Sequence, residues 1–137
     1  MITMLVVSGA SLAACTGSAS TSVVGDWRLV SYGSPGSLMP SAPDVDTSIV
    51  FGADGKVNGN VGCNGFGGDY TVDGNTITFG QIVSTLMFCE GPVGDQETTT
   101  LNVFAGSATF VLDGDTLTIT SADGSSVIML ARKSTYP

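Results

Sequence analysis

The sequence has no histidine and very little positive charge, and both deficits argue against whole classes of function. Its 137 residues include four Lys or Arg against twelve Asp or Glu, so the formal net charge is −8. No basic stripe is available to neutralise phosphates, which argues against nucleic-acid binding. The absence of His removes the commonest general base and the commonest metal ligand. We therefore expect no cofactor, no metal and no catalytic residues.

Charged residues of both signs are also scarce, at 12% of the chain, whereas hydrophobic residues make up 42%. A disordered chain shows the reverse balance, so this one should fold, and its length fits one ordinary domain. There is no apolar run of about 18 residues, which a membrane-spanning helix would need. The nineteen glycines are typical of a mostly β protein with many turns.

The amino terminus carries the clearest targeting signal. Residues 1–14 contain no charged side chain and end in Leu12, Ala13 and Ala14, immediately before Cys15. A Leu, two small residues and a Cys resemble the lipobox of bacterial lipoprotein signal peptides, in which the Cys thiol receives the lipid. The resemblance implies that Cys15 is lipidated and that the protein is attached to a membrane through this lipid anchor.

Two other interpretations of this segment are a short buried strand and a cleaved signal without lipidation. Residues 16–22 argue against both, because they are small, polar and uncharged, like a tether. We therefore divide the chain into a lipoprotein signal peptide (1–14), a lipidated Cys with its tether (15–24) and a globular domain (25–133).

The lipobox resemblance also implies a location in the cell envelope, facing the periplasm or the exterior. Thr16 stands directly after Cys15, where an Asp would retain the protein in an inner membrane. In a cell with two membranes, the resemblance implies the outer one.

Asp-Gly dipeptides recur between segments in which apolar and polar residues alternate. Each dipeptide favours a hairpin turn that needs positive φ. They predict antiparallel hairpins within seven or eight strands. Because so short a sheet must hide its edges, we expect a small barrel-like or strongly bent antiparallel sheet, in a mostly β (α+β) fold. The four dipeptides begin at Asp54, Asp73, Asp113 and Asp123.

One short helix is predicted over residues 95–105. Asp95 is the expected N-cap, and Gly106 is the expected stop signal. Leu101 and Phe104 would lie on the buried face. The long stretch before the second strand, residues 33–46, contains three prolines and is predicted to be a loop.

Two segments are distinctive in composition, namely residues 62–70 (GCNGFGGDY) and residues 84–90 (STLMFCE). With Trp27, they resemble the META domain, the family of the heat-shock protein HslJ. That family has a G-C-N-x-[FM]-x-G-x-Y stretch and, some twenty residues later, T-x-M-x-C. The matching positions are Gly62, Cys63, Asn64, Phe66, Gly68, Tyr70, Thr85, Met87 and Cys89.

The resemblance implies a small, mostly β domain found in envelope lipoproteins and associated with heat or antibiotic stress. It implies no defined catalytic activity. Independently of the family, the glycines of residues 62–68 suit tight bends, and Asn64 suits a turn cap. Phe66 and Tyr70 are expected to supply core area. This structural interpretation is favoured over ligand binding by the Gly-rich segment.

Cys63 and Cys89 remain once Cys15 is lipidated. Two buried free thiols and a metal-binding pair are alternatives to a disulfide, but two thiolates alone do not complete a zinc site. An envelope location favours oxidation. We predict a disulfide that ties the Gly-rich bend to a strand containing Met87.

Three functions remain in competition, in the following order. The first is a non-enzymatic interaction module that recognises another envelope protein or the cell wall, and it predicts an exposed apolar patch. The second is a binder of small ligands, which predicts a deep pocket near residues 62–70 or 84–85. The third is a carboxylate hydrolase, which predicts paired acids in a cleft.

Overall fold

The computed structural model describes residues 22–133, so the lipobox and Cys15 lie outside the described residues. The described part contains ten strands and one helix. In chain order they are β1 (Gly25–Ser34), β2 (Ser37–Pro40), β3 (Ser48–Phe51), β4 (Lys56–Asn60), β5 (Gly65–Asp73), β6 (Thr76–Phe79), β7 (Val83–Ser84), α1 (Gly91–Val103), β8 (Ser107–Asp113), β9 (Thr116–Thr120) and β10 (Val127–Arg132).

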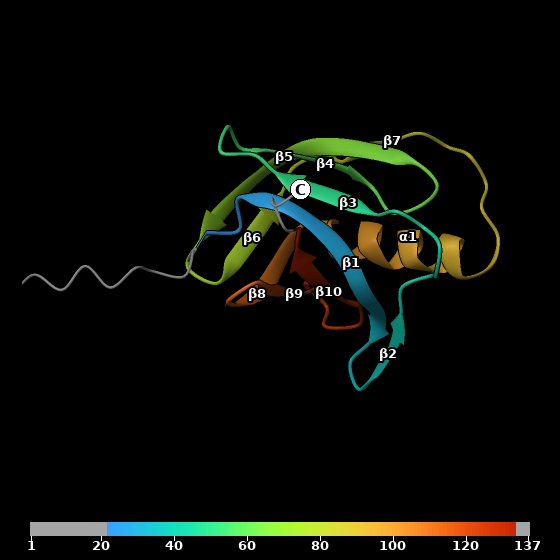
Figure 1. The fold of residues 1–137 in the computed structure, drawn as a ribbon. Coiled ribbons are helices and arrows are strands. Elements are labelled where there is room, and N and C mark those ends of the chain that lie inside the picture. Colours follow the sequence, from blue (N-terminus) through green and yellow to red (C-terminus); the bar gives the residue numbers. More distant parts are fainter. Residues whose placement is uncertain (1–21, 134–137) are drawn as a thin grey trace, which may run out of the picture.

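Eight of these strands close into an antiparallel barrel (Figure 1). The order is β10-β9-β8-β6-β5-β4-β3-β1, and the ring closes because β10 also pairs with β1. Closure removes the open sheet edges that would otherwise pair with other chains. The predicted mostly β fold with one short helix is confirmed. The other two strands lie off the ring, with β2 paired to β1 and β7 paired to β5.

All four Asp-Gly turns form as predicted, because each glycine adopts a positive φ between 58° and 81°. In the β9–β10 turn, the Asp123 carboxylate accepts hydrogen bonds from Ser121 Oγ and from Ser125 Oγ and N. The Ser121 bond is the main reason that the pKa of Asp123 falls to about 2, with the Ser125 bonds adding to it. These turns fix the register of the hairpins.

A bulge in β1 changes which side chains face the core. Trp27 and Leu29 are buried, as is expected of alternate residues on one face of a strand. The pairing with β10 then shifts register between Leu29 and Ser31. Consequently Tyr32, rather than Ser31, is the next buried side chain of β1.

The core is an aromatic cluster inside the barrel, sealed by the end of α1. Phe104 stacks on Phe79 at 4.4 Å between ring centroids and meets Phe66 edge-on at 5.5 Å. Phe51 and Tyr70 form a second edge-on pair at 5.0 Å. Such pairs add stability beyond the area that they bury.

The predicted helix start is wrong. Helix α1 begins at Gly91, with Glu90 as N-cap and Pro92 in its first turn, so Asp95 lies within the helix and does not cap it. Pro is tolerated there because the first helical N–H groups have no partner within the helix. The helix ends at Val103, two residues before the predicted end at 105.

Three other predictions need correction. The structure has more strands than the seven or eight expected, and the predicted loop over 33–46 contains strand β2. The segment around Met87 is not a strand, because β7 ends at Ser84. Residues 85–90 instead form an irregular connection to α1, in which Thr85 N still donates to the Gly65 carbonyl of β5 at 3.1 Å.

Candidate functional site

Three consecutive large apolar side chains stand in solvent on the connection between β7 and α1. Leu86 is 93% exposed, Met87 63% and Phe88 86%. We call these three residues the apolar loop. Single exposed apolar residues are ordinary, whereas a contiguous exposed group is a candidate interaction surface. Val83, just before it in β7, is also exposed.

A disulfide fixes the carboxyl end of this loop to the barrel. Cys63 and Cys89 are bonded, with their Cα atoms 6.3 Å apart. This is the pairing predicted from the sequence, but it holds a loop rather than a strand. Cys63 is buried in the connection between β4 and β5, so the bond joins the exposed segment to that connection.

Asn64 fixes the middle of the loop through its side-chain amide. Nδ2 donates to the Met87 carbonyl at 2.9 Å and to Glu97 Oε2 at 2.8 Å. Oδ1 accepts from Met87 N at 2.7 Å and from Thr85 Oγ1 at 2.8 Å. A primary amide offers two donors and two acceptor sites, so all of its capacity is used.

This role of Asn64 differs from the turn cap predicted for it. Asn64 does not adopt a positive φ, and its side chain bonds to segments more than twenty residues away. The residue is buried. Burial makes the network consequential, because an amide left without partners there would carry a desolvation cost.

Helix α1 contributes two buried polar side chains to this network and its surroundings. The Glu97 carboxylate accepts from the backbone N–H of Asn64 at 2.7 Å as well as from its side chain. Beside it, Gln96 accepts from Ala42 N at 2.9 Å and donates to the Val61 carbonyl at 2.5 Å. Both side chains are buried. The inward face of α1 therefore clamps two loops instead of presenting only apolar groups.

Gly94 allows the helix to approach the disulfide segment closely. A Cβ at this position would collide with the carbonyl oxygen of Cys89. Only glycine fits such an approach. Sequence reasoning missed Gly94, Gln96 and Glu97, because the helix was predicted to begin after Gly94, and no local pattern marks the partners of the other two.

An open groove of about 560 Å³ lies between strands β3, β4 and β5 and residues 83–85, which lead into the apolar loop. It is wide open to solvent and is not the deep pocket that the small-ligand interpretation predicts. Its position does match that interpretation, since it reaches the Gly-rich segment and residues 84–85. The lining residues are Ser48, Asn58, Gly59, Asn60, Gly65, Phe66, Val83, Ser84 and Thr85.

The other residues of the predicted motif are explained by backbone conformation, close packing or burial in the core. Gly62 has a φ of 116°, and a Cβ at Gly68 would lie 2.7 Å from the Gln81 carbonyl oxygen. Phe66 and Tyr70 are buried in the core, and the Tyr70 hydroxyl donates to the Gly52 carbonyl at 2.6 Å. The structure thus brings Cys63, Asn64, Thr85, Met87 and Cys89 together, whereas Tyr70 lies apart from them.

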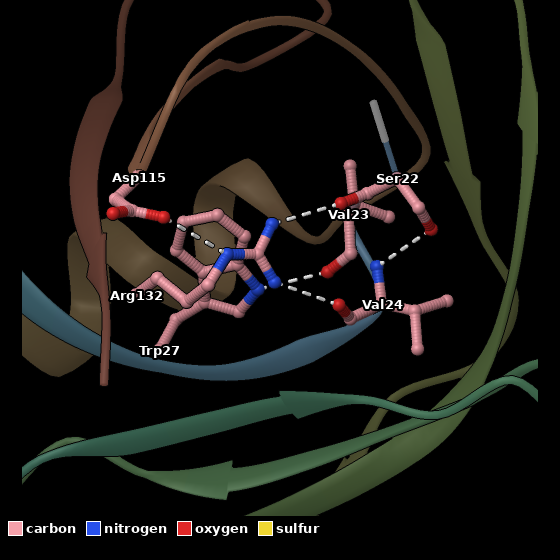
Figure 2. A network of polar contacts seen from close by, with 6 residues as sticks. All are labelled: Ser22, Val23, Val24, Trp27, Asp115 and Arg132. Atoms are coloured by element: carbon pink, nitrogen blue, oxygen red, sulfur yellow. Dashed lines mark hydrogen bonds and ion pairs between the residues drawn. The ribbon is translucent and has the colours of Figure 1, made fainter. Parts of the chain in front are cut away.

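At the other end of the barrel, Arg132 fastens the start of the described chain (Figure 2). Its guanidinium lies over the Trp27 ring, 4.3 Å from the centroid, and donates to the carbonyls of Val24 and Ser22. The Trp27 indole N–H donates to the Val23 carbonyl at 2.8 Å. Residues 22–24 are therefore held against the barrel where β1 begins.

The fold and this surface define a small closed β-barrel with one helix across it and a covalently fixed apolar loop. The profile of the META domain matches residues 20–134, which is most of the chain. The chain belongs to the META domain family. No curated protein matches it.

Solved structures share the fold. An NMR structure of a protein from Burkholderia xenovorans aligns with a TM-score of 0.64 and 18% identity, over 80% of this chain and 82% of that one. A crystal structure of a DUF4847 family protein from Bacteroides vulgatus aligns with a TM-score of 0.55 and 18% identity, over 80% and 92%. At such identities the likeness is one of fold.

Two further findings concern the described part of the chain. None of its helices is both long and apolar enough to cross a membrane. Residues 22–133 also contain no group of three or more His, Cys, Asp or Glu side chains that could hold a metal ion.

Proposed function

We propose that this protein is a non-enzymatic, HslJ-like lipoprotein of the cell envelope whose META domain binds a partner protein through the apolar loop, in a role related to stress. The observation that carries the proposal is the exposure of Leu86, Met87 and Phe88 on a segment that is fixed at both its middle and its end. The stress-related role rests on the family resemblance.

The fixed conformation matters because association must overcome the entropy of ordering side chains and loops. The disulfide at Cys89 and the amide of Asn64 have already ordered the backbone of this loop. A partner therefore meets a preorganised apolar surface. An enzyme would instead require convergent reactive groups in a water-excluding cleft, whereas the groove beside the loop is open and the chain has no His.

The start of the described chain and the apolar loop lie on different sides of the molecule. In Figure 1 the described chain starts at the left, whereas the connection from β7 to α1 lies at the right. Residues 15–21 can span at most roughly 25 Å when fully extended. With a lipid on Cys15, the barrel would sit close to its membrane and present the apolar loop away from it.

The anchor is tested by replacing the lipidation site. Cys15→Ser should move the protein from the membrane fraction to the soluble fraction, and from the detergent phase to the aqueous phase. Metabolic labelling with a fatty-acid analogue should mark the parent and not the variant. If the variant partitions like the parent, the lipoprotein part of the proposal is wrong.

The binding role is tested by photo-crosslinking in living cells. A photoreactive amino acid at Leu86 should form discrete protein adducts. The matched control is the same amino acid at Val111, which is 66% exposed on β8, and it should form few. Leu86→Ser with Phe88→Ser should fail to restore stress resistance in a deletion strain, whereas Val111→Ser should restore it. Equal adducts at both positions would contradict the role of the loop.

A further inference from the structure

Positive charge is confined to the end of the barrel where the described chain starts. Arg28 lies near the start of β1, and the other three basic residues each pair with a carboxylate. The pairs are Lys56 with Asp69, Arg132 with Asp115 at 3.5 Å, and Lys133 with Asp26 at 3.8 Å. The sequence contains no Lys, Arg or His between Lys56 and Arg132.

The apolar loop lies in a region of uncompensated negative charge. Glu90 and Asp95 follow it along the chain, and both are exposed. Neither forms an ion pair among the described residues. Their carboxylates therefore remain available to a cation brought by a partner.

A second pair of carboxylates is brought to the same end of the barrel by tertiary packing. A Cβ at Gly62 would lie 2.6 Å from Val45 Cγ1 and 3.0 Å from Val93 Cγ1. Val45 thus packs beside the first turn of α1. The residues on either side of it, Asp44 and Asp46, are both exposed.

Apolar side chains beside unpaired carboxylates are complementary to a basic amphipathic segment. We propose that the apolar loop docks a cationic amphipathic segment of a partner protein, with Lys or Arg of the partner facing Glu90 and Asp95. This inference rests on the proposed function and adds the chemistry of the partner. The apolar groups of that segment contact Leu86, Met87 and Phe88.

Two other occupants fit the surface less well. An anionic membrane would be repelled by the carboxylates around the loop, and the loop lies away from the start of the described chain (Figure 1). A second copy of this chain would bring a second set of the same carboxylates to the interface. The basic groups that could offset them lie at the other end, where three already have partners.

The test compares two synthetic amphipathic helices with identical apolar positions, one carrying Lys and the other Glu. Each is titrated into the full chain carrying Cys15→Ser, by calorimetry and NMR. We expect the Lys peptide to bind and to weaken as salt rises. Leu86→Ser with Phe88→Ser should weaken it by at least about tenfold. Glu90→Gln with Asp95→Asn should weaken it by roughly three- to tenfold and flatten the salt dependence.

Controls separate this result from unfolding. Val111→Ser should bind the Lys peptide like the parent, and the emission of buried Trp27 should show that each variant is folded. Equal binding of both peptides would overturn the inference. So would an affinity for the Lys peptide that is the same in the loop variants as in the parent. Loop-dependent binding to anionic vesicles, or loop-dependent dimerisation, without binding of the Lys peptide would overturn it as well.

The crosslinking experiment distinguishes the two levels of the proposal. Protein adducts at Leu86 without binding of the Lys peptide would leave the proposed function standing and reject the basic partner. Failure of both experiments would reject both.

Discussion

Replacing Cys63 and Cys89 with Ser is expected to lower the free energy of unfolding by about 3 kcal/mol. The two positions are 26 residues apart, and the chain-entropy model assigns a closed loop of that length about this value. For a domain of this size, the thermal midpoint should fall by roughly 10–20 °C. Denaturant unfolding of the Cys15→Ser background, with and without the two further changes, measures the difference.

Reduction provides the matched control for this pair. A reductant should destabilise the Cys15→Ser protein by a similar amount and leave the variant without cysteines unchanged. Leu86 and Phe88 are present with or without the disulfide. Any loss of partner binding at temperatures below the new midpoint therefore reports how much the disulfide-ordered loop contributes to binding. A purified native protein with two titratable thiols would contradict the expectation.

Asn64→Ala should cost about 2–4 kcal/mol, because the change removes the amide's hydrogen bonds to Thr85, Met87 and Glu97 and leaves buried groups without partners. The Glu97 carboxylate would keep its bond from the backbone of residue 64 but lose the one from the amide. The Met87 N–H would lose its acceptor. We expect this amide to exchange its hydrogen with solvent much faster.

Asn58→Ala is the control for this substitution, since Asn58 is an exposed residue of the neighbouring strand β4. It should change the free energy of unfolding by less than about 0.5 kcal/mol. If Asn64→Ala changes neither the free energy of unfolding nor the hydrogen exchange of the Met87 amide more than Asn58→Ala does, the Asn64 amide does not hold the loop. A destabilisation confined to the loop would appear as faster hydrogen exchange at Met87 with little change in global stability.

The predictions that succeeded depend on local chemistry. Asp-Gly turns specify their own backbone conformation, so the hairpins after Asp54, Asp73, Asp113 and Asp123 could be placed from the sequence. The alternation of side chains along a strand likewise accounts for the burial of Trp27 and Leu29 in β1. It failed at Tyr32, because a bulge depends on pairing with a strand that lies about a hundred residues later.

The predictions that failed depend on contacts that are distant in sequence. Gly91, Pro92 and Gly94 have the composition of a loop, yet they open a helix whose Gln96 and Glu97 bond to Ala42, Val61 and Asn64, at least 33 positions earlier in the chain. Asn64 resembles a turn residue, but its partners lie 21 to 33 positions away. Hydrophobicity alone placed Met87 in a strand, and nothing local indicated that the loop would be exposed.

The sequence by itself determined the family, the all-antiparallel hairpins, the charge of −8 and the availability of two cysteines for a bond. Each of these follows from residue types and short spacings. Only the tertiary structure decided that the barrel closes through β1 and β10, and that Leu86, Met87 and Phe88 lie in solvent. The physical reason is that exposure and closure depend on long-range packing. The buried amide of Asn64 and the carboxylate of Glu97 hold the apolar loop outside the core that its composition would otherwise favour.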